Sequence, residues 1–247
     1  MKIKKNIRYL ERQLSQIVGS SSDRKTLLFN IINYFQIEKV CEVGVWRGDF
    51  SDFLLQIKDI RKLYSVDPWE YQDAWEKPNN ISNNEFDNVF REAEIKLSKY
   101  GTRSVIIRSR FAAVKPSLLS DVDLFYIDGD HTLKGIFFDL CSAYKFSKNS
   151  WIILDDVCEN IWQHGINYQP TLVWPFAKYF SQFYGYSIFL LPYNQALLIP
   201  GKRFKVFNLS NIDYNESVEN WVPSQSIISK MRKASNFVRR FLRGSGQ

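Results

Sequence analysis

The sequence predicts an α/β domain with a mostly parallel sheet, on the strength of three observations. Short apolar runs alternate with longer stretches of helical periodicity, which is typical of parallel strands connected by helices. A glycine turn follows the first of these runs, and two later runs end abruptly in carboxylates. With 247 residues, 45% of them hydrophobic, the chain can bury the core of one such domain.

The expected elements follow in order along the chain. Apolar runs predict strands over 40–43, 63–66, 104–107, 124–127 and 151–154, and a closing hairpin over 186–191 and 196–199. Amphipathic periodicity predicts helices over 25–35, 50–58, 85–99, 112–119, 132–146 and 172–183. Residues 68–84 are expected to form a loop or lid. We expect a helical extension over 1–36, the domain itself over 37–200, and a C-terminal extension over 201–247.

The turn after the first predicted strand carries Glu42, Gly44 and Gly48 in the spacing ExGxxxG. Glycine lets the backbone approach a ligand closely, so this turn is a candidate cofactor site. Dinucleotide-binding turns have a further glycine that is missing here, which disfavours an NAD-dependent enzyme. Asp67 ends the second predicted strand, where a carboxylate can accept hydrogen bonds from a ribose diol.

Carboxylates also follow the fourth and fifth predicted strands, as Asp128 and as the pair Asp155 and Asp156. If these parallel strands are neighbours, the three side chains meet at one sheet edge and suit Mg²⁺. His131 follows Asp128 by three residues, a spacing at which an imidazole can act as a general base. The structural alternatives are a simple turn at Asp128, a helix cap at the acidic pair, and a helix-start histidine.

Four segments, EVGVWRGDFS, SVDPW, DLFYIDGDHTLKGIFFDL and WIILDDV, carry a family resemblance in this order. The chain resembles class I S-adenosylmethionine-dependent methyltransferases over roughly 37–200, specifically the branch of macrolide sugar O-methyltransferases that includes macrocin O-methyltransferase. The resemblance implies a Rossmann-like fold whose mostly parallel sheet has seven strands, with an antiparallel C-terminal hairpin strand. The chain departs from the family at Asn149, Ser150 and Trp151, because the family usually has two glycines before the last strand.

The resemblance also implies an activity, the methylation of a sugar or glycan hydroxyl by S-adenosylmethionine with help from Mg²⁺. The implied cofactor-binding residues are Glu42, Gly44, Gly48, Asp67, Ser109 and Asp128. The implied metal ligands are Asp128, Asp155 and Asp156, and the implied general base is His131. The aromatic residues Trp69, Tyr71 and Trp75 are candidates for stacking on a sugar face.

Two other functions stay open at this point. A metal-independent methyltransferase acting on another small molecule would share the cofactor site. A non-catalytic module that binds S-adenosylmethionine at a membrane or a partner would need neither His131 nor Asp155. Nucleic-acid methylation is disfavoured, because the chain lacks the Asn/Asp-Pro-Pro-aromatic motif of amino-methylating enzymes.

Cysteine usage and the first residues favour the cytoplasm. The three cysteines, Cys41, Cys141 and Cys158, are odd in number and fall within or beside predicted elements, so we expect ordinary thiols. The first twenty residues carry charges throughout, and no run has the length of a signal peptide or a membrane span.

Positive charge is concentrated at the two ends of the chain. Residues 1–12 and 225–247 together carry +10 against +7 for the whole chain, so the body between them is about −3, which argues against a nucleic-acid-binding core. Residues 227–243 predict a basic amphipathic helix. Its apolar stripe either packs on the domain or on a second subunit, or attaches to the anionic inner face of a membrane.

Overall fold

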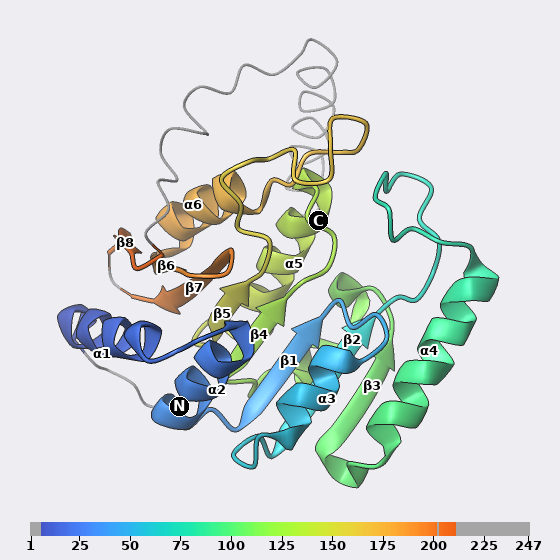
Figure 1. Ribbon diagram of the computed structural model, residues 1–247, viewed down its shortest axis with the longest axis horizontal. Helices are drawn as coiled ribbons and strands as arrows, with labels where there is room; N and C mark the ends of the chain where they lie inside the picture. The colour runs from blue at the N-terminus through green and yellow to red at the C-terminus, as the bar shows by residue number, and fades with distance from the viewer. Residues whose placement is uncertain (1–5, 202, 211–247) are drawn as a thin grey trace, which may run out of the picture. The chain divides into compact units, whose positions relative to one another are not determined.

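The computed structural model describes residues 6–201 and 203–210, and within them an eight-stranded sheet carries the fold (Figure 1). The strand order is β3-β2-β1-β4-β5-β7-β6-β8. The strands are β1 (Lys39–Val43), β2 (Lys62–Asp67), β3 (Ser104–Arg108), β4 (Leu124–Ile127), β5 (Trp151–Leu154), β6 (Tyr186–Leu191), β7 (Gln195–Pro200) and β8 (Lys205–Asn208). Strands β1 to β5 pair in parallel, and β7 is antiparallel to β5 and β6. The predicted α/β fold, mostly parallel with an antiparallel hairpin, is confirmed.

Helices cover both faces of this sheet. They are α1 (Ile7–Gly19), α2 (Arg24–Phe35), α3 (Asp49–Gln56), α4 (Asn83–Ser98), α5 (Leu133–Phe146) and α6 (Val173–Tyr184). Side chains alternate across β4: Leu124 and Tyr126 join the core formed with α1, α2 and α3. Phe125 packs on the other face against Phe111, whose ring also contacts Phe146 of α5. A strand buried on both faces explains the continuous apolar run at this position.

Two elements differ from the prediction. The helix expected over 112–119 is wrong, because this segment forms two short 3₁₀ turns, Phe111–Ala113 and Pro116–Leu118. Pro116 disfavours helical backbone at the preceding residue, and Lys115 is extended with ψ 124°, so a continuous helix cannot form. The sheet also has an eighth strand, β8, which lies beyond the predicted domain end at residue 200 and pairs in parallel with β6.

Strand register brings the ends of four strands to one sheet edge. Val43 of β1 lies beside Val66 of β2 and Ile127 of β4, and Ile127 lies beside Leu154 of β5. The amide of Asp155 donates to the Ile127 carbonyl at 3.0 Å. The chain leaves β1 toward β2 on one side, and β4 lies on the other side, so this edge contains the crevice where open α/β sheets bind ligands.

None of the helices within the described residues is long and apolar enough to cross a membrane. The basic helix predicted over 227–243 lies outside the described residues.

Candidate functional site

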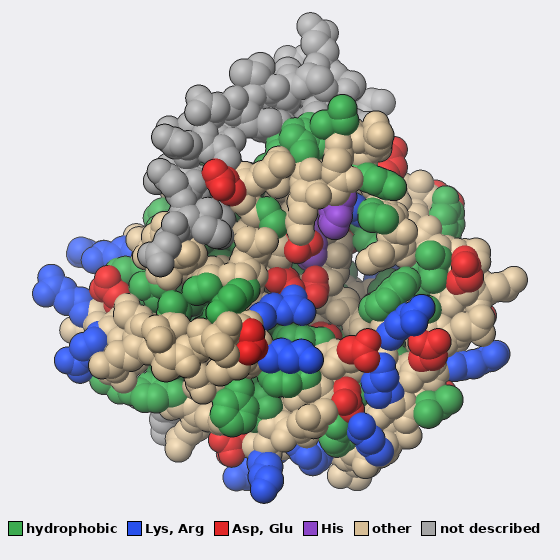
Figure 2. Space-filling view, viewed as in Figure 1, with side chains coloured by type: hydrophobic (Ala, Val, Ile, Leu, Met, Phe, Trp, Pro, Cys, Tyr) green, Lys and Arg blue, Asp and Glu red, His purple; other side chains and the backbone are tan. Residues whose placement is uncertain are grey.

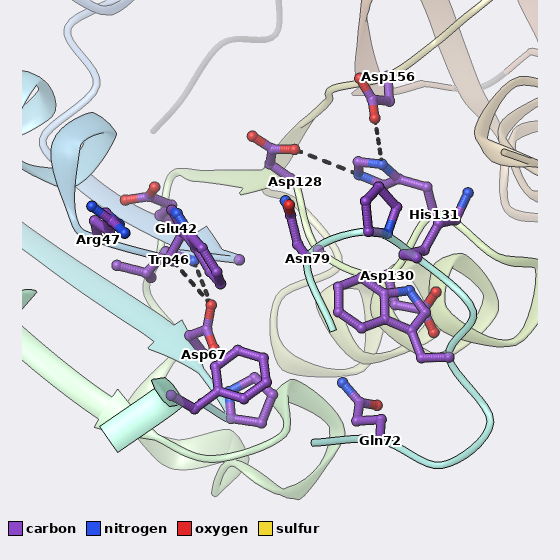
Figure 3. A pocket seen from close by; sticks show the side chains of 18 of the residues that line it. Glu42, Trp46, Arg47, Asp67, Gln72, Asn79, Asp128, Asp130, His131 and Asp156 are labelled. Atoms are coloured by element: carbon purple, nitrogen blue, oxygen red, sulfur yellow. Dashed lines mark hydrogen bonds and ion pairs between the residues drawn. The ribbon is translucent and has the colours of Figure 1, made fainter. Parts of the chain in front are cut away.

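A cavity of about 580 Å³ opens at this edge of the sheet, and its volume is typical of ligand sites, which span about 300–1,000 Å³. Acidic side chains and a histidine gather at a hollow near the middle of the face in Figure 2. In Figure 3, Glu42, Trp46 and Asp67 lie on one side of the cavity, and Asp128, His131 and Asp156 lie on the other. The cavity therefore has two halves, one beside the glycine turn and one beside the carboxyl ends of β4 and β5.

Gly44 occupies a position that only glycine fits. Its φ is 88°, and a Cβ built there would lie 2.1 Å from the Asp128 carbonyl oxygen. The turn is thus packed directly against the end of β4, and its backbone lines the cavity. Gly48, in contrast, precedes α3 and faces α4: a Cβ built at Gly48 would lie 3.3 Å from the Cβ of Ala93. Gly48 is not among the residues that line the cavity.

Asp67 shapes the glycine turn as well as lining the cavity. One carboxylate oxygen accepts the amides of Val45 at 2.8 Å and Trp46 at 3.1 Å, and the other accepts the amide of Trp69 at 2.7 Å. Burial raises the pKa of Asp67, and these three amides act in the opposite direction. Its binding to a ribose diol stays a prediction.

Glu42 is a buried carboxyl group on the cavity wall, with 1% of its surface exposed. The Ser51 hydroxyl donates to it. Burial raises the pKa of Glu42 to about 8, although the hydrogen bond from Ser51 lowers it. The group is therefore largely protonated at neutral pH, and a positively charged ligand beside it would favour its ionised form.

Ser109 lies away from the main cavity. It lines a smaller, open cavity of about 400 Å³ together with Arg108 and Arg110. Its amide donates to the Asp67 carbonyl at 3.0 Å, which holds the end of β3 against the end of β2. A role for Ser109 in the adenine pocket stays a prediction.

Asp128 and Asp156 line the second half of the cavity, whereas Asp155 is buried at the end of β5 and is not among the lining residues. Burial, together with the negative charges of Asp155 and Asp156, raises the pKa of Asp128 well above its usual range. Asp155 is buried, pairs with the Arg24 guanidinium, and accepts the Tyr126 hydroxyl at 3.0 Å. Sequence reasoning correctly brought these carboxylates to one place.

His131 lies between two of these carboxylates. Its Nδ1 is 2.8 Å from an oxygen of Asp156, and its Nε2 is 3.6 Å from an oxygen of Asp128. Nε2 is buried and has no hydrogen-bond partner within the described part of the chain. Burial raises the pKa of Asp156, but the hydrogen bond and charge of His131 outweigh it and lower that pKa to about 2. The other oxygen of Asp156 accepts the Gln163 amide at 3.1 Å.

The arrangement of these carboxylates does not fit the predicted Mg²⁺ site. Among the described residues, no three His, Cys, Asp or Glu side chains surround a point that could hold a metal ion. Asp155 is engaged by Arg24, and both oxygens of Asp156 are engaged by His131 and Gln163. The ligand set of Asp128, Asp155 and Asp156 is therefore not supported, because Arg24, His131 and Gln163 already bind Asp155 and Asp156 and the three side chains do not surround one point.

Two loops meet beside the cavity and bind each other through side chains. Lys77 donates to the Gln169 carbonyl at 2.7 Å and to the Thr171 hydroxyl at 3.2 Å. The Gln169 side chain donates to the Ala74 carbonyl at 2.9 Å and accepts the Glu76 amide at 3.2 Å. We call residues 72–80 and 161–171 together the clasp. It joins the predicted lid to the loop after the double aspartate.

Only one of the three predicted stacking aromatics is placed for that role. Trp69 is fully buried, donates its indole N–H to the Trp46 carbonyl at 2.8 Å, and packs on Phe90, so it belongs to the core. Tyr71 is exposed and is not among the residues lining the cavity. Trp75 lines the cavity, and its indole N–H is buried without a partner in the described residues.

Sequence reasoning did not identify three residues around the acidic centre, namely Arg24, Lys77 and Gln163. Arg24 is separated from Asp155 by 131 positions, and no local pattern links them. Lys77 stands in a polar loop where a lysine is ordinary. His164 also lines the cavity, with its Nε2 3.9 Å from a carboxylate oxygen of Asp156.

Similar solved structures share this fold. The methyltransferase domain of the bacterial protein CtHen1 is 13% identical, with a TM-score of 0.52, and the alignment covers 75% of this chain and 99% of that one. A Staphylococcus aureus protein assigned as a caffeoyl-CoA O-methyltransferase is 16% identical, with a TM-score of 0.54, covering 80% of this chain and 94% of that one.

A curated relative was also found, an uncharacterised protein of Acanthamoeba polyphaga mimivirus. It is 24% identical over 139 residues, which span 55% of this chain and 60% of the relative. The chain therefore matches less than two thirds of that relative's length.

The fold places the glycine turn and its cavity at the central strand edge, where open α/β sheets of the Rossmann class bind nucleoside-containing cofactors. Residues 41–157 match the family model described as a methyltransferase domain. The matched segment is just under half of the chain, and together with the shared fold it supports an S-adenosylmethionine-dependent methyltransferase.

Proposed function

We propose that this methyltransferase transfers the methyl group of S-adenosylmethionine to a hydroxyl group of a sugar or glycan. The observation that carries the proposal is the placement of His131, whose Nδ1 is held by Asp156 while Nε2 has no partner. A hydroxyl is a poor nucleophile at neutral pH, so its methylation needs a nearby base. An imidazole with one nitrogen fixed and the other available meets this need.

The chain fits the proposed cofactor at the glycine-turn half of the cavity. Gly44 lets the turn pack against the end of β4 so that its backbone lines the cavity, and Glu42 and Asp67 line the same half of the cavity. When bound, S-adenosylmethionine supplies an electrophilic methyl carbon on a positively charged sulfur. Glu42 would face this positive charge, and Asp67 would accept the ribose hydroxyls while it holds the turn.

The reaction at the other half of the cavity balances as a displacement. The acceptor oxygen forms a bond to the methyl carbon, the bond from that carbon to sulfur breaks, and S-adenosylhomocysteine leaves with the electron pair. Nε2 of His131 takes the hydroxyl proton. Asp156 accepts a hydrogen bond from the Nδ1–H group, so it fixes the tautomer and stabilises the imidazolium that forms.

The acceptor class is inferred from the walls beside His131. Trp75 presents an apolar ring with an unpaired indole N–H, and Gln72 and Asn79 add polar groups to the same wall. Aromatic rings with hydrogen-bonding neighbours suit the apolar face and hydroxyl rim of a sugar. No step of this reaction passes through a metal ion, because Asp155 already binds Arg24 and Asp156 already binds His131 and Gln163.

The test combines cofactor binding with methyl transfer. Calorimetric titration with S-adenosylhomocysteine is expected to give one site per chain. Incubation with methyl-labelled S-adenosylmethionine and a panel of nucleotide sugars and glycolipids is expected to label a sugar acceptor. His131→Ala is the matched control and should bind S-adenosylhomocysteine normally but label nothing.

Two results would contradict the proposal. Absence of S-adenosylhomocysteine binding would remove the cofactor assignment. Labelling confined to acceptors without a sugar, such as phenols, would leave a methyltransferase with another substrate class.

A further inference from the structure

Arg24 is the first residue of α2, and its guanidinium reaches the carboxyl end of β5. There it forms an ion pair with Asp155, whose side chain is only 5% exposed. Burying a carboxylate without a cationic partner is strongly unfavourable. The ionised Asp155 side chain therefore depends on the positive charge of Arg24.

The position of Arg24 is fixed from several sides. Its guanidinium lies over the Phe50 ring, 5.1 Å from the centroid, and that ring packs on Tyr126 with a centroid separation of 4.5 Å. The Tyr126 hydroxyl donates to Asp155 and accepts the Gln195 amide at 2.7 Å. Residues from α2, α3, β4, β5 and β7 therefore build this ion pair together.

The guanidinium also faces the other carboxylates of the centre. Burial lowers the pKa of Arg24, but Tyr126 and the carboxylates of Asp155, Asp128 and Asp156 outweigh burial and raise it. An arginine cannot lose its proton in a protein, so this positive charge is permanent. It sits among the three side chains in which the sequence predicted a magnesium ion.

We propose that Arg24 is the resident cation of the acidic centre and that this methyltransferase holds no divalent ion among Asp128, Asp155 and Asp156. A divalent ion at Asp155 would have to displace the guanidinium and would be repelled by it at short range. Arg24 thereby acts as a positioning residue: it fixes Asp155, and through Asp155 the neighbouring Asp128 that faces His131. One consequence rests on the proposed function, namely that methyl transfer needs no added metal ion.

Manganese binding to the full chain tests the proposal without turnover. Free Mn²⁺ gives a six-line electron paramagnetic resonance signal that is lost on binding, and Mn²⁺ accepts the same oxygen ligands as Mg²⁺. The wild type is expected to leave the signal unchanged. Arg24→Ala, which removes the cation paired with Asp155, is expected to take up one Mn²⁺ per chain and to lose that uptake when Asp155→Asn is added.

The controls separate charge from general stability. Arg61→Ala removes an arginine that pairs with Glu38 at 3.2 Å on the surface, and it is expected to take up no Mn²⁺. Arg24→Lys keeps a positive charge and is expected to behave like the wild type. Arg24→Ala is expected to lower the melting temperature, and Mn²⁺ is expected to restore part of the loss.

Two results would overturn the proposal. The first is uptake of one Mn²⁺ by the wild type that Asp155→Asn abolishes, and this measurement stands even if Arg24→Ala fails to fold. The second is a folded Arg24→Ala that takes up no Mn²⁺ and melts like the wild type. S-adenosylhomocysteine titration is run on each variant, because loss of that binding in the wild type would contradict the proposed function and leave the ion-pair assignment standing.

Discussion

The Nδ1 atom of His131 lies 2.8 Å from a carboxylate oxygen of Asp156. Asp156 follows β5 with φ 53°, a left-handed backbone that few residues other than glycine, asparagine and aspartate adopt readily. This conformation turns consecutive carboxylates to different partners: Asp155 pairs with Arg24, and Asp156 pairs with His131. The two consecutive aspartates thus hold two different groups in place: Asp155 holds the Arg24 guanidinium, and Asp156 holds the His131 imidazole.

The first prediction concerns the base and its orienting carboxylate. His131→Ala is expected to lower kcat by about 10²- to 10⁴-fold, the usual contribution of a general base. Asp156→Asn should lower kcat by a smaller factor, because the imidazole stays but loses its fixed tautomer. Initial rates with labelled cofactor measure both. Unchanged S-adenosylhomocysteine affinity is the control, and a fully active His131→Ala would remove the histidine from the mechanism.

The second prediction follows from the raised pKa of Glu42. Its pKa is about 8 in the folded protein, against 4.5 ordinarily, so the folded state holds more protons than the unfolded state between these values. Stability therefore falls as pH rises from about 4.5 through 8. Glu42→Gln, which is neutral at every pH, should melt higher than the wild type at pH 8 and show a flatter pH dependence. A steeper fall in the variant would contradict the raised pKa.

Cofactor binding should be coupled to the same group. A positively charged cofactor beside Glu42 favours its ionised form, so binding at pH 7 is expected to release up to one proton. Calorimetry in two buffers with different ionisation enthalpies measures this release. S-adenosylhomocysteine, which lacks the sulfonium charge, should release fewer protons than S-adenosylmethionine, and Glu42→Gln should release none from this site.

The strands and the acidic edge were predictable because each depends on a local pattern. A buried parallel strand is a short apolar run, and the residue after it must lie at the sheet edge, which located Asp67, Asp128 and Asp155. The partners of those side chains depend on how distant helices pack. Arg24 reaches Asp155 only because α2 crosses that end of the sheet, which no nearby residue encodes.

The same limit explains the misassigned aromatic residue and helix. Trp69 follows Asp67 closely, and sequence position alone does not say whether its ring faces the cavity or the core formed with Phe90. Helical periodicity over 112–119 is outweighed by Pro116, which disfavours helical backbone at the preceding residue, Lys115.

The third prediction tests the close approach at Gly44. Alanine there needs a left-handed backbone, a strain of about 1–3 kcal/mol, and also brings a Cβ within 2.1 Å of the Asp128 carbonyl oxygen. Because the obstacle is backbone, it cannot move aside as a flexible side chain would. Gly44→Ala is expected to lower the melting temperature and abolish S-adenosylhomocysteine binding in calorimetry.

The matched control for this substitution is Gly19→Ala at the end of α1. A Cβ at Gly19 meets nothing within 4 Å, so that variant should bind the cofactor product normally and keep its stability. Normal binding by Gly44→Ala would show that the turn can move away from β4.

The fourth prediction concerns the clasp. Lys77 is buried and donates to Gln169 and Thr171, so Lys77→Met keeps the length of the side chain but leaves the Gln169 carbonyl without this donor. Because this hydrogen bond is only partly buried, such a loss costs about 1 kcal/mol, the lower end of the usual range. Hydrogen exchange over 72–80 and 161–171 is expected to become faster, and KM for the acceptor should rise more than kcat falls, because the wall carrying Trp75 loses its support.

Lys62→Met is the control for the clasp, because Lys62 also donates to a backbone carbonyl, that of Thr102 at 2.6 Å, but on the exposed surface away from the cavity. It should leave exchange in both clasp loops unchanged. If exchange in both loops is also unchanged in Lys77→Met, the hydrogen bonds of Gln169 are sufficient to hold the loops together. The double variant Lys77→Met with Gln169→Ala is then expected to exchange faster in both loops. Unaltered exchange in that double variant would mean that packing, and not these hydrogen bonds, keeps the loops together beside His131.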